Sequence, residues 1–425
     1  MVYMTKTSGL LKKITQYDER YLVIAIFLCA FGIRLISLLL AQTHNIDFFR
    51  FFERSSMVIN GEMSYQDFGD PKPLWTYTLA GWLYLFGATE FNASVLLIFV
   101  DLLGALVFLF IGKKIFGGKQ GLIPVLLYLF LPFTILFPSA EGKMDVFPIL
   151  FVLLSFLCLL KKRYLLSSIF LGIGMGYKYL AGLCLIPFLF YILEKKNYSA
   201  TLKYSFVCGL SAFSITLPFI LLSPKKFIGD TLLFFITRND TGYSFYHPYN
   251  FVPYFVPLII ILIGVCLVMI NGAKIKKFSY NDLIPLTFFL IMVVNIFNRV
   301  LFTQYFLYAI PFLCLILTRF VIEGKKWIFF IGCSMTFPLA IEYLSNFGLA
   351  IPGGKMIMGT VDINPLPWKV FIGDISLVTF VWVFATTLFL FIIWNRELRK
   401  NNRLSRCCLR HKQNSESGSS ARKTH

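Results

Sequence analysis

The polar residues best suited to chemistry lie together, directly after the first long apolar run of the 425-residue chain. Residues 44–77 read HNIDFFRFFERSSMVINGEMSYQDFGDPKPLWTY and mix Asp and Glu with Arg and Lys. A carboxylate such as Asp47 can take a proton from a hydroxyl group. A cation such as Lys72 can stabilise an anion that leaves during a transfer reaction. The stretch is therefore a candidate reaction centre.

The composition of the whole chain indicates where this centre is held. Mean hydropathy is +0.74, with 57% hydrophobic and 14% charged residues, which excludes an ordinary soluble protein. Apolar runs of about 20 residues can cross the roughly 30 Å hydrocarbon core as helices. Such runs recur from Tyr21 almost to the C-terminus, and the first lacks a small-residue cleavage site. We therefore predict an all-α, polytopic membrane protein with a retained first helix.

Twelve spans are expected along the chain. They cover residues 21–41, 92–111, 120–137, 146–160, 164–177, 179–193, 202–222, 254–270, 283–297, 300–318, 327–345 and 370–394. The two spans on either side of Lys178 are too short to cross comfortably, which favours a hairpin that turns inside the membrane. Residues 1–394 form one membrane domain in this interpretation, and residues 395–425 a basic, disordered tail.

The distribution of charge predicts the orientation. Lys and Arg accumulate in short cytoplasmic loops, and a cytoplasmic N-terminus places most of the 40 basic residues inside and most of the 21 acidic residues outside. Both termini are then cytoplasmic, and residues 42–91 form an extracytoplasmic loop. The net charge of +19 needs no nucleic acid partner, because anionic membrane lipids can balance it.

The first outer loop holds two apolar or amphipathic segments. Phe49 and Phe52 alternate with Arg50 and Glu53 in a pattern suited to a helix that lies on the membrane surface. The segment PLWTYTLAGWLYLFG at residues 73–87 is apolar enough to cross, but a crossing would invert every later loop. We therefore predict that it lies along or partly within the outer surface.

Two charges fall inside predicted spans. Arg34 and Asp101 lie about 10 to 14 Å below the outer surface at 1.5 Å per residue. Isolated charges at that depth are costly. We predict that the two side chains pair, or that both point into a wet cavity.

Several motifs, taken in order, resemble the GT-C glycosyltransferases that use polyprenyl-phosphate sugars. They are NIDFF, INGEMSYQDF, PKPLWTYTLAGWLYLFG, FVDLLGALVFLFIGKKIFG, EGKMDVFPILF and FTQYFLYAIPFL. The resemblance implies transfer of a hexose such as mannose, with inversion, from a polyprenyl-phosphate donor to a lipid, glycan or protein acceptor outside the cytoplasm. Asn45-Ile46-Asp47 stands where GPI mannosyltransferases carry D-x-D, so no metal ligands are assigned, although a divalent metal remains an option.

The resemblance also implies roles for individual residues. Asp47 matches the catalytic Asp of the family and is the candidate general base. The alternative is that it caps the following helix. Lys72 matches the lysine near the lipid phosphate, while the alternative is an ordinary interfacial lysine. The tight connection PSAEGKMD can contact a sugar or acceptor, or it can be a solvated helix cap. The candidate substrate-binding residues are Lys72, Tyr65, Glu141, Lys143, Asp145, Lys178, His247, Arg299, Gln304 and Tyr305.

Two other functions stay open at this point. A multi-pass transporter or lipid flippase is the main alternative, although such proteins often carry broken helices in both halves, and only the segment near Lys178 suggests one here. A non-catalytic subunit of a glycosylation machine would bind a lipid-phosphate sugar without turning it over. Gln304 is expected to face other helices or a cavity, because an unpaired amide inside a span is costly.

Overall fold

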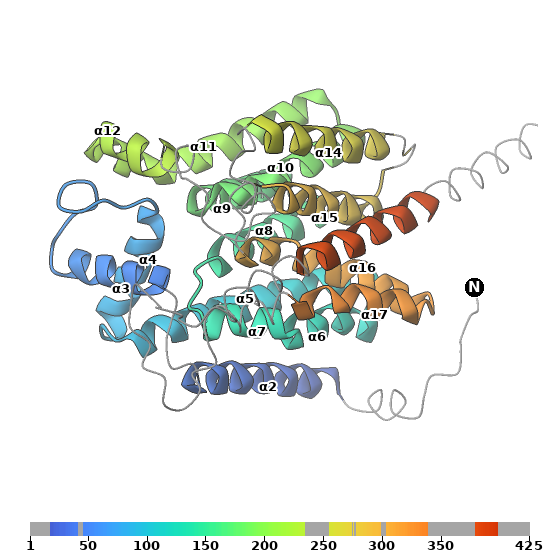
Figure 1. Cartoon of the computed structure of the whole chain (residues 1–425), viewed down its shortest axis with the longest axis horizontal. Helices are drawn as coiled ribbons and strands as arrows, with labels where there is room; N and C mark the ends of the chain where they lie inside the picture. The colour runs from blue at the N-terminus through green and yellow to red at the C-terminus, as the bar shows by residue number, and fades with distance from the viewer. Residues whose placement is uncertain are drawn as a thin grey trace, which may run out of the picture.

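Figure 1 shows the computed structural model of the chain, which describes residues 18–40, 46–233, 255–273, 275, 278–298, 303–338 and 379–397. Within these ranges every regular element is a helix, and the single β-bridge joins Ser64 to Phe68. The predicted all-α class is confirmed.

The described helices coincide with most of the predicted spans. Seven spans correspond to single helices, namely α2 (Glu19–Leu40), α5 (Glu90–Phe116), α8 (Val146–Leu160), α9 (Tyr164–Tyr177), α11 (Tyr198–Leu222), α14 (Phe255–Ala273) and α15 (Tyr280–Ile296). The remaining spans contain divided or partly described helices, namely η1 (Gly118–Leu122), α6 (Ile123–Phe130), α7 (Pro132–Ser139), η2 (Tyr179–Cys184), α10 (Leu185–Lys195), η4 (Thr303–Tyr308), α16 (Ile310–Ile322), α17 (Lys326–Ser334) and the C-terminal helix Thr379–Glu397.

The predicted number of twelve spans is not confirmed. Four described helices are long and apolar enough to cross a membrane, or five if one bent pair counts as a single span. The difference has two causes: undivided helices such as α8, α9 and α15 have only 14 to 17 residues, and other apolar runs are divided into shorter helices. The run 120–137 bends by 55° at Leu131, just before Pro132, whose ring prevents a continuous helix. The break at Lys178, expected from the short flanking runs, is present between α9 and η2.

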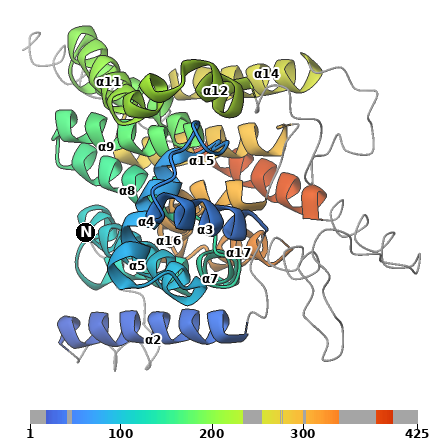
Figure 2. The ribbon, with the colours of Figure 1, turned by 90° about the vertical axis from the view of Figure 1, so that its left-hand side faces the viewer.

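The helices lie side by side in a bundle, with α2 along one edge and α11 with α14 along the opposite edge in both views (Figures 1 and 2). The central helices α5, α8, α15 and α16 contribute the largest share of the buried apolar core. Two helices of the first outer loop, α3 (Ile46–Ile59) and α4 (Pro73–Phe86), cover one end of the bundle (Figure 1).

The predicted pairing of the two deep charges is confirmed. Arg34 Nε on α2 donates to Asp101 Oδ2 on α5 at 2.8 Å, and both side chains are buried. Tyr128 donates to the other oxygen of Asp101 at 2.7 Å. The remaining guanidinium nitrogens donate to the carbonyls of Leu129 and Thr134, which flank the bend between α6 and α7. The pair therefore holds α2 against α5 and against the broken helix.

The outer helices α3 and α4 pack on each other and position the first outer loop. Phe48, Phe51 and Ser55 are buried on one face of α3, whereas Glu53 is exposed, so the helix is amphipathic as predicted. Phe49 and Phe52, which the pattern places on the apolar face, are only partly buried. α4 has 14 residues and extends about 21 Å, which is short of the roughly 30 Å of a hydrocarbon core. This length is consistent with a helix that lies at the surface.

Candidate active site

Asp47 lies in the first turn of α3, at the rim of a buried charged cluster. Its side chain is 46% exposed and accepts a hydrogen bond from Lys143 Nζ at 3.3 Å. α3 begins at Ile46, so Asp47 is the second residue of the helix rather than the capping residue before it. A carboxylate in this turn still interacts favourably with the helix dipole. Asp47 can therefore stabilise the start of α3 through the helix dipole and also act as a base.

The connection between α7 and α8 brings three charged residues to Asp47. Its glycine, Gly142, has a φ of +65°, a conformation that L side chains rarely adopt. A Cβ atom on Gly142 would also collide with the ring of Phe48, the residue after Asp47. Glycine therefore allows the connection to lie directly against α3.

Lys143 lies between two carboxylates in this connection. Its Nζ is 3.3 Å from Asp47 Oδ2 and 3.5 Å from Glu141 Oε2, and both Lys143 and Glu141 are buried. Burial raises the pKa of Glu141 to about 8, although the nearby ammonium of Lys143 opposes the shift. Burial favours a lower pKa for Lys143, but the carboxylates of Glu141 and Asp47 outweigh it and raise that pKa. Lys143 is therefore a permanent cation beside Asp47.

A second ion pair lies next to the first. Lys178, at the break between α9 and η2, pairs with Asp145 Oδ1, and both side chains are buried. Tyr308 donates to the same oxygen at 3.3 Å. The Lys178 ammonium also lies 4.5 Å from the ring centroid of Tyr305 and 5.6 Å from that of Trp75. Two predicted residues that are distant in sequence, Lys178 and Asp145, thus meet through a helix break.

Lys72 completes the cluster from the start of α4. Its Nζ lies 4.2 Å from the ring centroid of Trp75, the aromatic side chain that Lys178 also contacts. Its backbone nitrogen donates to the buried carboxylate of Asp70, which fixes the turn before α4. Burial and the nearby charge of Lys178 lower the pKa of Lys72 to about 7. An anion bound here would be attracted by two lysines on one aromatic platform.

Residues 70–222 match the family model described as dolichyl-phosphate-mannose-protein mannosyltransferase. The match covers the lysine at α4, the connection 140–145 and the helix break at Lys178. The likeness to this mannosyltransferase family is limited to these residues and does not reach Asp47. The apolar helices of the chain make it an integral membrane protein.

The other comparisons are distant. The crystal structure of ArnT from Cupriavidus metallidurans in the apo state is similar, with a TM-score of 0.49 and 14% sequence identity. The similarity covers 87% of this chain and 77% of the ArnT chain. No curated protein sequence matches the chain.

The donor set around Asp47 does not suit a two-carboxylate metal site. Such a site needs acidic oxygens that converge on one point. Here the ammonium of Lys143 lies between Asp47 and Glu141, and the ammonium of Lys178 is on Asp145. Among the described residues, His, Cys, Asp and Glu form no group of three that could hold a metal ion. Lysines therefore supply the positive charge between these carboxylates.

Tyr65 lies outside the cluster that contains the lysines. It is buried, adopts a φ of +67°, and donates to or accepts from Thr231 Oγ1 at 3.1 Å. Its ring packs on Phe227 at 5.7 Å between centroids. The predicted substrate-binding residue Tyr65 thus joins the first outer loop to the segment after α11, and no contact links it to the lysines in the described part of the chain.

The remaining candidates fall into two groups. Gln304 and Tyr305, in η4, are both buried, and the predicted burial of Gln304 is confirmed. Tyr305 joins the cluster through Lys178. His247 and Arg299 lie outside the described residues.

Sequence reasoning missed two aromatic residues of the cluster. Trp75 contacts both Lys72 and Lys178, yet nothing in its sequence position distinguishes it from other interfacial aromatics. Tyr308 could have been found, because residues three apart in a 3₁₀-helix lie on one face and Tyr305 was already a candidate.

Proposed function

We propose that this protein is a GT-C glycosyltransferase that moves a hexose, with mannose the leading candidate, from a polyprenyl phosphate to an acceptor hydroxyl at the extracytoplasmic face, with inversion. The description of the matching family model names a dolichyl-phosphate mannose donor, which supports the donor class. The excess of Lys and Arg in the loops opposite residues 42–91 supports the extracytoplasmic side.

Asp47 acts as the general base in this proposal. It takes the acceptor proton while the acceptor oxygen bonds to the anomeric carbon and the bond from that carbon to the phosphate oxygen breaks. The side chain is 46% exposed, so an acceptor can reach it, and Lys143 holds it at 3.3 Å. A base positioned in this way typically contributes about 10² to 10⁴ in rate.

Lys72 and Lys178 receive the phosphate. The polyprenyl phosphate leaves as a stable anion, so no second carboxyl group has to protonate it. Both ammonium groups contact the ring of Trp75 and come from two separate segments, one from the start of α4 and one from the break after α9. Preorganised cations stabilise developing negative charge without reorganisation during the reaction.

One observation carries the proposal: the candidate base Asp47 and the cations Lys72, Lys143 and Lys178 come from four separate segments and converge on one cluster. Convergence of this kind is expected for a site and not for unrelated interfacial charges.

The test replaces Asp47 in the full-length protein in membranes supplied with a panel of polyprenyl-phosphate sugars. Asp47→Asn should lower sugar transfer by about 10² to 10⁴, measured by the mass of the product. Glu53→Gln removes an exposed carboxylate from the same helix and should transfer at the wild-type rate. Unchanged turnover in folded Asp47→Asn protein would remove Asp47 from the reaction.

A further inference from the structure

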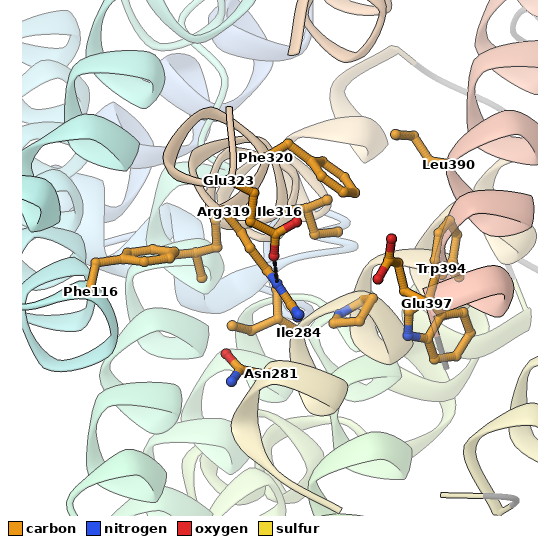
Figure 3. Close-up of a pocket in the computed structure, with 13 residues that line it drawn as sticks. Phe116, Asn281, Ile284, Ile316, Arg319, Phe320, Glu323, Leu390, Trp394 and Glu397 are labelled. Carbon is orange, nitrogen blue, oxygen red and sulfur yellow. Dashed lines mark hydrogen bonds and ion pairs between the residues drawn. The ribbon is translucent and has the colours of Figure 1, made fainter. Parts of the chain in front are cut away.

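A pocket lies at the end of the helical bundle away from Asp47. It is bounded by the last turn of α5, the first turn of α15, the last turns of α16 and the C-terminal helix. α5 has 27 residues and extends about 40 Å, and its first turn lies at the α4 end while Phe116, its last residue, lines the pocket. Figure 3 shows the residues that line it. The pocket therefore shares no residue with the candidate active site.

The walls of the pocket are apolar and its mouth is charged. Ile284, Phe289, Leu315 and Leu390 are buried side chains of the wall. The mouth carries Arg319, Glu323 and Glu397 (Figure 3), joined by Lys325, which donates to both glutamates at 2.9 Å. An apolar cavity with a charged rim suits a molecule that has an apolar body and a polar head.

Two donors in this pocket have hydrogen-bonding capacity left over. Arg319 uses Nε for Glu323 at 2.8 Å, and no other hydrogen bond of its guanidinium is made to the described part of the chain. Trp394 is 9% exposed, and its buried Nε1 has no hydrogen-bond partner among the described residues. A buried indole N–H normally has an acceptor, because an unpaired one is costly. An acceptor from outside the chain would satisfy both donors.

We propose that this pocket binds the phosphodiester group of a membrane phospholipid, with its acyl chains against the apolar wall. Guanidinium groups bind phosphate oxygens through parallel N–H donors, and the indole N–H adds a third donor. The ion pairs of Glu323 and Glu397 with Lys325 and Arg319 already neutralise both carboxylates, so they do not repel the phosphate. Basic side chains between the ends of membrane helices bind lipid head groups at the membrane boundary, and Arg319 is the basic side chain with free donors here.

The experiment measures lipid adducts of the intact full-length protein by native mass spectrometry during titration with dioleoylphosphatidylglycerol. Arg319→Gln should weaken binding about tenfold, since it removes charged donors. Trp394→Phe keeps an aromatic ring without the N–H and should weaken binding about threefold. Dioleoylglycerol, which lacks phosphate, should bind wild type and both variants equally.

The controls separate this site from general membrane attraction. Lys203→Gln removes an exposed charge from α11 and should leave lipid binding unchanged. Glu323 keeps Lys325 as a partner in Arg319→Gln, so the variant retains its local ion pair. If Arg319→Gln does not fold, Trp394→Phe decides alone. Equal phosphatidylglycerol affinity in wild type and the folded variants, or full competition by inorganic phosphate, overturns the proposal.

Discussion

The Arg34–Asp101 pair and the candidate active site are both buried groups of charge, but their polar atoms are used differently. In the first group, both oxygens of Asp101 accept hydrogen bonds, from Arg34 and Tyr128. The other guanidinium nitrogens of Arg34 donate to backbone carbonyls. Every charged atom in this group thus has a partner within the chain.

The candidate active site leaves atoms unused. Asp145 Oδ2 and Trp75 Nε1 are buried, and neither has a hydrogen-bond partner among the described residues, while Glu141 Oε2 is 3.5 Å from the ammonium of Lys143. The ammonium of Lys72 faces aromatic rings instead of a carboxylate. Unsatisfied buried polar atoms are costly, so a fold keeps them where a ligand supplies the missing partner. We call the Arg34–Asp101 group closed, because its charged atoms all have partners, and the candidate active site open, because some of its polar atoms do not. A closed group stabilises the fold, whereas an open group is available for a substrate.

Breaking the closed group should give the largest loss of stability. Arg34→Met leaves Asp101 buried without its cation, which should lower the free energy of unfolding by about 3 to 5 kcal/mol. Thermal unfolding in detergent measures the change. Adding Asp101→Leu should recover much of it, since no charge then remains buried.

Lys113→Met is the matched control for Arg34→Met. Lys113 pairs with Glu19 at 2.7 Å and so also joins α5 to α2, but both side chains are about one-third exposed. An exposed pair contributes at most about 1 kcal/mol. Equal losses of thermal stability in Arg34→Met and Lys113→Met would show that the buried Arg34–Asp101 pair contributes no more than an exposed pair.

Breaking the open group should change activity and leave stability nearly unchanged. Lys72→Gln removes a cation that has no carboxylate partner, so little native structure is lost. Sugar transfer should fall about 10- to 100-fold, the loss expected for one charge-assisted contact to phosphate. Lys225→Gln, an exposed lysine of α12 (Pro224–Phe227), should retain the wild-type rate. A loss of thermal stability as large as that of Arg34→Met would show that Lys72 stabilises the fold, as Arg34 does, and is not held in reserve for a substrate.

The role of Lys72 in binding the donor phosphate also predicts how the KM for the donor depends on pH. The pKa of Lys72 is lowered to about 7, so free enzyme loses this charge as the pH rises through that value. The KM for the donor should therefore rise above pH 7, because the neutral amine attracts phosphate less strongly. Lys72→Arg stays charged at these pH values, so its KM should be flat.

The geometry that holds Lys143 on Asp47 can be disturbed without removing any charge. Gly142→Ala combines a φ of +65° with a collision against Phe48, whereas Gly117→Ala places the same methyl group at a φ of +74° in open space. Gly117 also has a ψ of 159°, a conformation essentially restricted to glycine, so both variants should lose about 1 to 3 kcal/mol of stability from backbone strain. Only Gly142→Ala should also lower sugar transfer, because Lys143 and Asp47 separate. Equal rates in the two variants would show that the contact of this connection with Phe48 does not matter.

Sequence reasoning located features that depend on local physics. The depth of Arg34 and Asp101 in their apolar runs was enough to predict that they pair. The short runs around Lys178 predicted a break, and the alternation of Phe with charge predicted the amphipathic helix α3. Each of these conclusions follows from periodicity or from the cost of a charge in an apolar environment.

Features that depend on long-range packing were not predictable. Tyr65 was assigned to substrate, but its partners Phe227 and Thr231 lie more than 160 positions later in the chain. The pair between Lys178 and Asp145 forms because a helix break turns one side chain toward a connection 33 residues earlier. No sequence period encodes such contacts, since the relative placement of helices decides them.

A pH-dependent effect on stability concerns Glu141, the protonatable acid of the open group. Burial raises its pKa from 4.5 to about 8, so the folded state binds more protons than the unfolded state between these values. The free energy of unfolding should therefore fall as the pH rises from 5 to 8. Melting temperatures of Glu141→Gln should be flatter across this range, whereas Glu53→Gln should keep the wild-type slope. If the melting temperature of Glu141→Gln falls with pH as steeply as that of wild type, the folded protein holds Glu141 as an ionised partner of Lys143. The candidate active site would then contain one more satisfied salt bridge.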